Sequence, residues 1–211
     1  EKPFQRKKTI TLSKPENKIN DLWPFLEKKI KNNEQIFWVC PLIEESKKLN
    51  FSSTTKTFEI VNKKFPQKVG LIHGALNQEE KENVLKKFLN NEISILVSTT
   101  VIEVGIDFPN ATVIIIENSN KFGLAQLHQL RGRIGRGDKL GTCILLFKNQ
   151  LSQNAKTRIQ ILKKSDDGFY IAEEDMKLRG YGDIIGFKQS GTKLFKLADP
   201  VHHEDLFKLA E

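Results

Sequence analysis

Short, strongly apolar runs alternate along the first 150 residues with longer segments whose apolar positions recur every three or four residues. The first pattern is typical of buried strands and the second of amphipathic helices. Their alternation predicts an α/β domain with a parallel sheet between helices. We expect strands at residues 10–12, 35–41, 68–73, 93–97, 113–116 and 142–147, and helices at 17–31, 50–65, 77–89 and 124–130.

Local signals support several of these elements. Pro24 must lie in the first turn of the first helix, because proline has no N–H and so cannot make the backbone hydrogen bond that a helix interior requires. Asn77 is a plausible N-cap, and Glu79 and Glu80 follow in the first turn, where acidic side chains complement the helix dipole. The run at 113–116 is apolar on both faces, as a parallel strand covered by helices must be. Because ligands of such sheets bind beyond the carboxyl ends of the strands, we expect the functional residues in the loops that follow them.

The pattern changes at about residue 151. Ser152 is a candidate N-cap for a helix that runs to about Lys164, and a second helix is expected at 170–178 after an Asp-Asp-Gly break. From Arg179 the sequence RGYGDIIGFKQSG is glycine-rich and basic, which is not typical of a core. We therefore expect an α/β domain at 1–150 and a helical hairpin with a loop and tail at 151–211.

Composition indicates the kind of partner. The 211 residues include 34 Lys and Arg against 26 Asp and Glu, which gives a formal net charge of +8 and a pI of about 9.4. This balance favours a polyanionic partner, nucleic acid first and an anionic membrane surface second. Cys40 and Cys143 lie in apolar runs, the usual setting of buried reduced thiols, and no spacing typical of metal ligands occurs. We find no signal peptide and no membrane-spanning apolar stretch, and a start at Glu1 rather than Met fits a fragment.

Half of the chain's six arginines fall within six residues. Arg131, Arg133 and Arg136 lie in the stretch QLHQLRGRIGRG at 126–137, whereas positive charge elsewhere is almost always lysine. The planar guanidinium fork suits phosphate oxygens in a way that lysine cannot imitate, and the intervening glycines permit close backbone approach. A solvated basic turn is the simpler interpretation, but the spacing Gln-x-x-Gly-Arg-x-Gly-Arg that begins at Gln129 favours a phosphate site.

A second candidate segment is STTVIEVGIDFP at 98–109. Thr99 and Thr100 place hydroxyls directly after a predicted buried strand, where they can hydrogen-bond phosphates. Gly105 permits close backbone approach, and Asp107 can orient a ribose or an arginine. The alternative is an ordinary turn between a strand and a loop.

The remaining candidates are weaker. His73 and Gly74 follow the strand at 68–73, and a histidine there is as readily structural as it is a phosphate contact. His128 lies within the arginine stretch and can brace its loop. The chain contains neither a Walker A sequence nor the Asp-Glu pair of a Walker B strand. A cradle for ATP phosphates and the ligands of Mg²⁺ would therefore have to come from other sequence.

Taken together, these motifs resemble a known family. The spacing Gln-x-x-Gly-Arg-x-Gly-Arg is similar to the last motif of superfamily 2 helicases. From about residue 35 to the end, the chain resembles the second RecA-like motor domain of the RecG family of bacterial fork-remodelling DNA helicases, although Tyr181 and Pro200 depart from its pattern outside the motifs. The segments that carry this resemblance are VCPLIEESKKL, GLIHG, TTVIEVGIDFPNATVIIIEN, FGLAQLHQLRGRIGRG and DGFYIAEEDMKLRGYGDIIGFKQSG.

The resemblance implies a three-layer RecA-like domain followed by a translocation hairpin, and it implies roles for the candidate residues. Arg133 and Arg136 would be arginine fingers that stabilise charge on the transferring phosphoryl group, and Gln129 would sense the γ-phosphate. Gly105 and Asp107 would line the nucleotide. The implied contacts to DNA phosphates are His73, Gly74, Thr99 and Thr100, and the implied residues that couple motor closure to movement are Arg179 and Gln189.

The resemblance also implies partners and a cellular role. The full-length protein would be an ATP-dependent translocase on double-stranded DNA that remodels stalled replication forks and branched recombination intermediates, in the bacterial cytosol at the nucleoid. Mg²⁺ would be held by a first RecA-like motor domain of the same polypeptide, which would also carry a DNA-binding wedge domain. The chain alone is expected to bind no cofactor and to be inactive. The alternatives are a motor like that of the transcription-repair coupling factor, a non-catalytic nucleic-acid-binding module of helicase shape, and a protein-docking domain.

Overall fold

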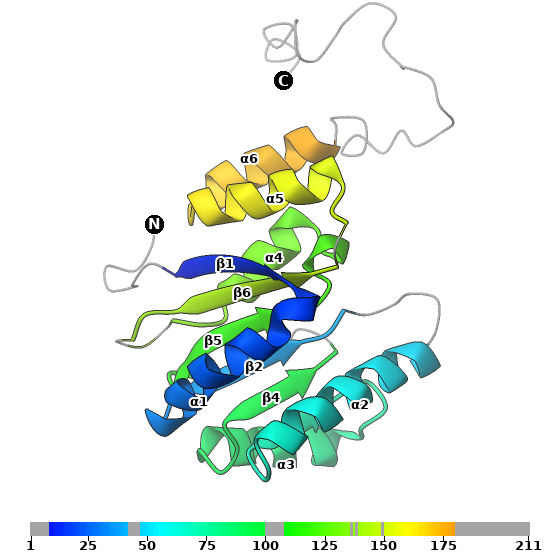
Figure 1. The fold of residues 1–211 in the computed structure, drawn as a ribbon, viewed down its shortest axis with the longest axis vertical. Coiled ribbons are helices and arrows are strands. Elements are labelled where there is room, and N and C mark those ends of the chain that lie inside the picture. Colours follow the sequence, from blue (N-terminus) through cyan, green and yellow to red (C-terminus); the bar gives the residue numbers. More distant parts are fainter. Residues whose placement is uncertain are drawn as a thin grey trace, which may run out of the picture.

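A six-stranded, all-parallel sheet is the centre of the fold, with strand order β1-β6-β5-β2-β4-β3 (Figure 1). The computed structural model describes residues 9–41, 47–99, 108–135, 137, 139–148 and 150–179. The strands are β1 (Ile10–Pro15), β2 (Gln35–Val39), β3 (Val69–Ile72), β4 (Ile95–Ser98), β5 (Ala111–Ile116) and β6 (Thr142–Phe147). The α-helices are α1 (Trp23–Lys31), α2 (Lys47–Lys64), α3 (Gln78–Leu89), α4 (Leu124–Arg131), α5 (Gln153–Lys164) and α6 (Gly168–Arg179), and the 3-10 helices are η1 (Glu16–Leu22) and η2 (Ser119–Lys121).

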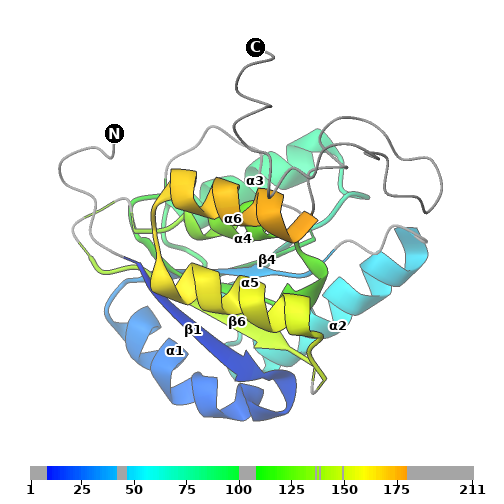
Figure 2. The same cartoon turned by 90° about the horizontal axis from the view of Figure 1, so that it is seen from above.

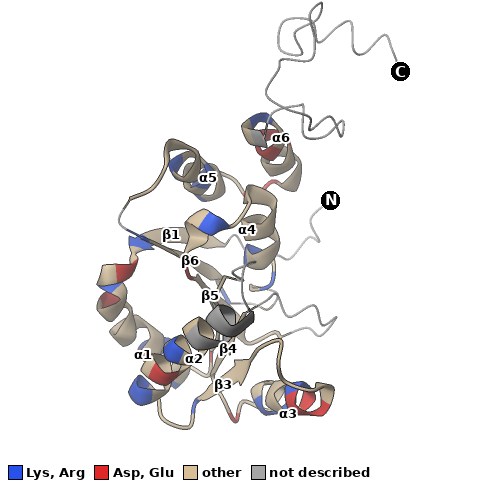
Figure 3. Cartoon of the chain, turned by 90° about the vertical axis from the view of Figure 1, so that its right-hand side faces the viewer, with Lys and Arg blue, Asp and Glu red and all other residues tan. Residues whose placement is uncertain are grey.

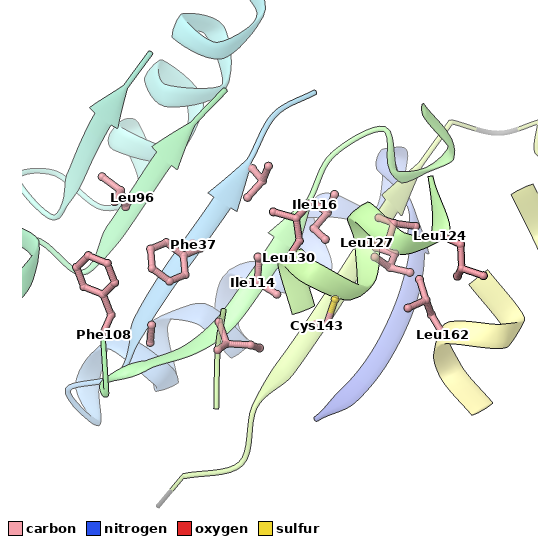
Figure 4. Close-up of a cluster of buried hydrophobic side chains, with 14 of the residues drawn as sticks. Phe37, Leu96, Phe108, Ile114, Ile116, Leu124, Leu127, Leu130, Cys143 and Leu162 are labelled. Atoms are coloured by element: carbon pink, nitrogen blue, oxygen red, sulfur yellow. The ribbon is translucent and has the colours of Figure 1, made fainter. Parts of the chain in front are cut away.

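Side chains alternate between the two faces of each strand, so the sheet has a hydrophobic cluster on either side. On β5, Ile114 and Ile116 enter one cluster, and Val113 and Ile115 enter the other. The first cluster includes residues of α3, α4, α5 and α6, and the second includes residues of η1, α1 and α2. Figure 2 shows α3, α4 and α6 on one side of the sheet and α1 and α2 on the other, and Figure 4 shows the first cluster. This is the three-layer α/β architecture that the apolar pattern predicts.

Every predicted strand and helix of the described chain is present, with boundaries that shift by a few residues. The main difference lies in the first helix, which we expected as one segment over 17–31. The chain instead forms η1, in which Lys18 has non-helical backbone angles, and α1 begins only at Trp23 with Pro24 in its first turn. Proline fixes its own φ and lacks an N–H, so it suits a helix start and does not continue the preceding turn.

The predicted caps are confirmed. The Asn77 side chain accepts from the Glu80 backbone N–H at 2.8 Å, and the Glu80 carboxylate accepts from the Asn77 N–H at 2.9 Å, which together form a capping box at the start of α3. Ser152 accepts from the Ala155 N–H at 3.3 Å at the start of α5. Both cysteines are free and buried, and burial raises the pKa of the Cys143 thiol to about 12, as expected for a structural thiol.

The hairpin formed by α5 and α6 packs directly on the α/β domain. Both helices contact α4, and α5 also contacts β1. Ile159 and Leu162 of α5 and Ile171 of α6 belong to the same buried cluster as Leu127 of α4. The hairpin therefore shares a core with the sheet, and the division at residue 150 stays a prediction.

One half-buried carboxylate joins three elements at the carboxyl end of β5. The Glu117 side chain accepts hydrogen bonds from Trp38 Nε1 at 2.8 Å and from Thr57 Oγ1 at 3.1 Å, and so links β5 to β2 and α2. Burial raises the pKa of this carboxyl above its ordinary value of 4.5, although the hydrogen bonds from Trp38, Thr57 and Cys40 act in the opposite direction. Its protonated form is therefore favoured by folding.

We expect Glu117→Gln to remove a pH-dependent loss of stability. Because the folded-state pKa of Glu117 is raised, its contribution to stability is fully present below about pH 4.5 and is lost as the pH rises through the folded-state pKa. Glutamine keeps an oxygen acceptor for Trp38 but has no charge to desolvate. Urea unfolding from about pH 4.5 upward should show the unfolding free energy of the variant increasing relative to that of the wild type as the pH rises. A difference in unfolding free energy that stays constant with pH would contradict the assignment.

Candidate nucleotide and nucleic-acid site

Helix α4 presents the first half of the arginine stretch. Leu124, Leu127 and Leu130 are at most 1% exposed and fix the helix against the sheet. Gln129 is exposed and Arg133, just beyond the helix end, is half-buried. Within the described part of the chain, neither of these two side chains has a hydrogen bond or ion pair. The helical period therefore separates an anchored apolar face from a polar face that is available to a ligand.

Arg131 has the opposite environment, because it is only 3% exposed. Its guanidinium donates to the backbone oxygens of Leu162 at 2.5 Å and Ser165 at 2.9 Å, and it lies 3.1 Å from the Asp166 carboxylate. These partners are the end of α5 and the connection to α6. The sequence grouped Arg131 with the phosphate-facing arginines, whereas the structure uses its fork to hold the hairpin.

Two further contacts complete the surroundings of Arg131. Its Nη1 donates to Thr11 Oγ1 of β1 at 3.3 Å, and its Nη2 lies 3.0 Å from Nδ1 of His128. A Cβ added at Gly168, at the start of α6, would lie 3.4 Å from Nε2 of His128. The prediction that His128 braces this region is consistent with these contacts.

A second arginine, which the sequence did not single out, joins the middle of α5 to the segment just before α4. Arg158 of α5 donates to the Phe122 backbone oxygen at 2.6 Å and to the Asn120 oxygen at 3.5 Å, just before α4 begins. Helix α4 is thus tied to α5 near its start by Arg158 and at its end by Arg131. The only sequence signal for Arg158 was the scarcity of arginine itself.

Glycines bring the second half of the stretch against the sheet. Gly135 has φ +70°, a conformation that L side chains rarely adopt, and its N–H donates to the Ala111 oxygen at 3.2 Å. A Cβ at Gly137 would lie 2.9 Å from the Pro109 oxygen. Pro109 and Ala111 are at the amino end of β5. The expectation that all the motifs lie beyond the carboxyl ends of the strands is therefore wrong for this loop. Helix α4 runs antiparallel to β5 and so returns the chain to the amino ends of the strands.

The candidate DNA contacts do lie at the carboxyl ends of strands. His73 and Gly74 follow β3 and Thr99 follows β4, and the Thr99 N–H donates to the Ile72 oxygen at 3.3 Å, which brings these strand ends together. His73 Nδ1 accepts from the Ala75 N–H at 3.2 Å, so in the neutral ring Nε2 carries the proton and is a donor suited to phosphate. Thr99 as a whole is only 5% exposed, so little of its surface is accessible to a ligand in this structure.

Several predicted site residues lie outside the described residues. They are Thr100, Gly105, Asp107, Arg136 and Gln189. Arg179 was expected on the loop after the hairpin, but it is the last residue of α6.

The described residues fit the phosphates of a nucleoside triphosphate. Gln129 offers an exposed amide, and Arg133 offers a guanidinium that no described residue neutralises, which are the groups that meet phosphate oxygens. The glycines of the following loop permit close backbone approach. Mg²⁺ needs carboxylate or phosphate oxygens, and the described residues contain no cluster of three or more His, Cys, Asp or Glu that could hold a metal.

Solved structures first define the class of protein. Domain 2 of the DEAD-box helicase Mss116p, in a structure bound to an RNA duplex, superposes with a TM-score of 0.55 at 21% identity, over 81% of this chain and 68% of that one. At this identity the likeness concerns the fold alone. The parallel sheet between two layers of helices is the architecture of RecA-like helicase domains.

Family comparisons are more specific. The helicase conserved C-terminal domain family matches residues 17–138, and the C-terminal part of domain 3 of the ATP-dependent DNA helicase RecG matches residues 165–210. The chain therefore belongs to the helicase C-terminal domain family, and within it to the RecG type.

Individual relatives support this assignment. The ATP-dependent DNA helicase RecG of Bacillus subtilis is 44% identical over 204 residues, which are 96% of this chain and 30% of the relative. That of Thermotoga maritima is 47% identical over 94% of this chain and 26% of its own length. A structure of RecG bound to a three-way DNA junction has a TM-score of 0.74 at 41% identity, over 99% of this chain and 27% of that one. The chain thus spans less than a third of the length of these relatives.

The described helices include none that is both long enough and apolar enough to cross a membrane.

We expect Arg131→Ala to destabilise the 211-residue chain strongly. The substitution leaves Asp166 and two backbone oxygens without their buried donor, and breaking a buried ion pair costs about 3–5 kcal/mol of unfolding free energy. Arg131→Lys should recover little of this, because an ammonium cannot present a fork to several acceptors. Urea unfolding gives the values, with Arg133→Ala as the control for loss of a nearby arginine. Equal stability of the Arg131→Ala and Arg133→Ala variants would disprove the anchoring role.

Proposed function

We propose that the chain is the C-terminal motor half of an ATP-dependent double-stranded DNA translocase and helicase that remodels stalled replication forks and branched recombination intermediates. The RecG helicases named above and the RecG structure with a three-way junction support this substrate class. The match of the RecG domain to 165–210 favours this type over a transcription-repair coupling factor. Arg133, which no described residue neutralises, argues against a non-catalytic module. The protein works in the bacterial cytosol at the nucleoid.

One observation carries the proposal: helix α4 presents the polar residues of the candidate arginine site and is also bonded to the hairpin. Its polar face presents Gln129 and leads to Arg133, and its ends are fixed to the hairpin through Arg158 and Arg131. A displacement of α4 that follows ligand contact at Arg133 is therefore transmitted to α5 and α6 through short hydrogen bonds and a shared core. A motor that uses ATP to move on DNA requires this kind of connection.

In this mechanism the chain completes a site whose other half lies on a first RecA-like motor domain of the same polypeptide. That domain supplies the phosphate cradle and Mg²⁺, which neutralises charge on the phosphates of ATP. Arg133 and Arg136 stabilise the charge that develops on the transferring phosphoryl group, and Gln129 contacts the γ-phosphate. Gly105 and Asp107 line the nucleotide. The chain by itself lacks the cradle and hydrolyses no ATP.

DNA is held through its backbone. His73, Gly74, Thr99 and Thr100 contact phosphates, which positions the motor without reading sequence. A wedge domain elsewhere in the polypeptide holds the branch point. Arg179 and Gln189 couple closure of the two motor domains to movement of the duplex.

Substitution of Arg133 in the full-length protein tests the catalytic assignment. An arginine finger contributes about 10³–10⁵ in rate because it meets charge that develops in the transition state, so Arg133→Ala should lose most DNA-stimulated ATP hydrolysis. Arg133→Lys should fail nearly as badly, whereas nucleotide binding should persist in both variants. Phosphate release and binding of a fluorescent ATP analogue give the two readouts. Lys56→Ala, an exposed change on α2, is the control, and near wild-type hydrolysis by Arg133→Ala would refute the assignment.

Substitution of the coupling residues tests the hairpin. Arg179→Ala and Gln189→Ala, in the full-length protein, should leave DNA-stimulated hydrolysis mostly intact while unwinding of a forked DNA falls sharply. The reason is that Arg179 is the last residue of α6 and Gln189 follows it in the sequence, so neither belongs to the arginine stretch at 126–137. Both rates are measured on the same fork, and parallel losses would remove the coupling role.

A further inference from the structure

The amino ends of the strands form a continuous rim on the sheet. The Ser94 and Ile95 N–H groups donate to the Lys68 oxygen, and the Ile36 N–H donates to the Ser94 oxygen, which joins the starts of β3, β4 and β2. The Gln35 N–H donates to the Asn110 oxygen at the start of β5. We call this the amino-end rim. It lies at the opposite ends of β3 and β4 from His73, Gly74 and Thr99.

Helices α1, α2 and α3 all end at this rim, since each is followed within six residues by β2, β3 or β4. Their last turns and the adjoining loops are rich in lysine. Lys139, before β6, extends the set and donates to the Asn32 oxygen at 3.1 Å. Figure 3 marks basic positions on α1, α2 and α3. The exposed lysines of the rim are Lys28, Lys31, Lys63, Lys64, Lys68, Lys86, Lys87 and Lys139.

Acidic residues at the rim are fewer than its exposed lysines. Lys31 pairs with Glu27 at 2.9 Å, and the half-buried Lys29 is neutralised by the buried Glu34 at 2.8 Å. The other exposed acidic residues within a helical turn of the rim lysines are Glu59, Glu82 and Glu92, and Asp138 precedes Lys139 outside the described residues. No ion pair links the other exposed lysines to the described part of the chain. Lysines in the last turns of the helices complement the helix dipole, but the dipole does not explain Lys68 and Lys139 in the loops.

The dimensions and chemistry of the rim suit a nucleic-acid duplex. Away from the start of β5, where Gly135 and Gly137 of the arginine stretch approach, the rim crosses β2, β4 and β3, and at about 4.8 Å between neighbours this is roughly 10 Å. Duplex DNA rises about 3.4 Å per base pair, so this span faces roughly three base pairs of phosphates. Lysine is a flexible point charge, which suits contact with a phosphate backbone without selection of sequence.

We propose that the amino-end rim is a second contact surface for duplex DNA phosphates, separate from the carboxyl-end residues His73, Gly74 and Thr99. This inference rests on the proposed function, because a protein that acts on branched DNA meets more than one duplex arm. The carboxyl-end residues hold the arm on which the motor moves. The rim, about 17 Å away along β4, attracts another arm of the same junction.

The test is the salt dependence of binding of a three-way DNA junction to the full-length protein, without ATP. Lys64→Gln with Lys68→Gln should lower the slope of log K against log salt by roughly 2, which is about one unit for each phosphate that the variant no longer neutralises. Lys18→Gln with Lys56→Gln removes the same charge from exposed positions away from the rim and should leave the slope unchanged. Equal slopes for the rim variant and the wild type, or equal reductions of the slope in the rim and control variants, would overturn the proposal.

Other occupants are separated by additional measurements. If the rim variant keeps its DNA slope but no longer binds vesicles of anionic phospholipid or polyglutamate, the rim serves a membrane or an acidic protein and the proposal fails. If it lowers ATP hydrolysis at saturating DNA with an unchanged slope, the rim docks the other motor domain and the proposal fails. Unwinding by the wild type is recorded in parallel. If the wild type does not unwind DNA but its salt slope still depends on the rim lysines, the proposed function is refuted and the DNA contact at the rim is supported.

Discussion

The burial of one arginine constrains the rest of the arrangement. The Arg131 guanidinium lies among backbone oxygens, a carboxylate, a hydroxyl and an imidazole at the meeting point of α4, β1 and the turn between α5 and α6. A charge in such a place is tolerated only when its donors are satisfied, so each of these elements has to stay in register with the others. Because Arg131 ends α4, the same constraint sets where Arg133 emerges from the helix.

This constraint changes how the hairpin is understood. A helical pair that follows an α/β domain in sequence suggests a separate appendage, yet Ile159, Leu162 and Ile171 complete the hydrophobic cluster of the sheet. The packed interior transmits displacement because it is dense and has little room to deform. The hairpin and α4 therefore share one packed interior, which is the physical connection that the proposed coupling between the arginine stretch and the hairpin requires.

Arginine and lysine have different uses in this chain. Arg131 and Arg158 are fixed against backbone oxygens, where the planar fork can satisfy several acceptors at once. Most lysines remain exposed, and many of them gather where α1, α2 and α3 end. Arg131 and Arg158 thus serve internal anchoring, whereas phosphate binding is the role that we propose for Arg133, and only the position of each residue in the fold distinguishes the two uses.

The local pattern of residues determined much of this protein. Short apolar runs and helical apolar spacing predicted the strands and helices, and Asn77 and Ser152 marked two helix starts, because these signals depend on neighbours in sequence. Tertiary structure decided the separation of Arg131 from Arg133, the division of the first helix into η1 and α1, and the position of Gly135 and Gly137 at the amino end of β5. Two arginines two residues apart lie on different sides of a helix end, and a sequence cannot state what packs against each side. Burial of Arg131 depends on Asp166 and Leu162, which become its neighbours only when the hairpin folds back on α4.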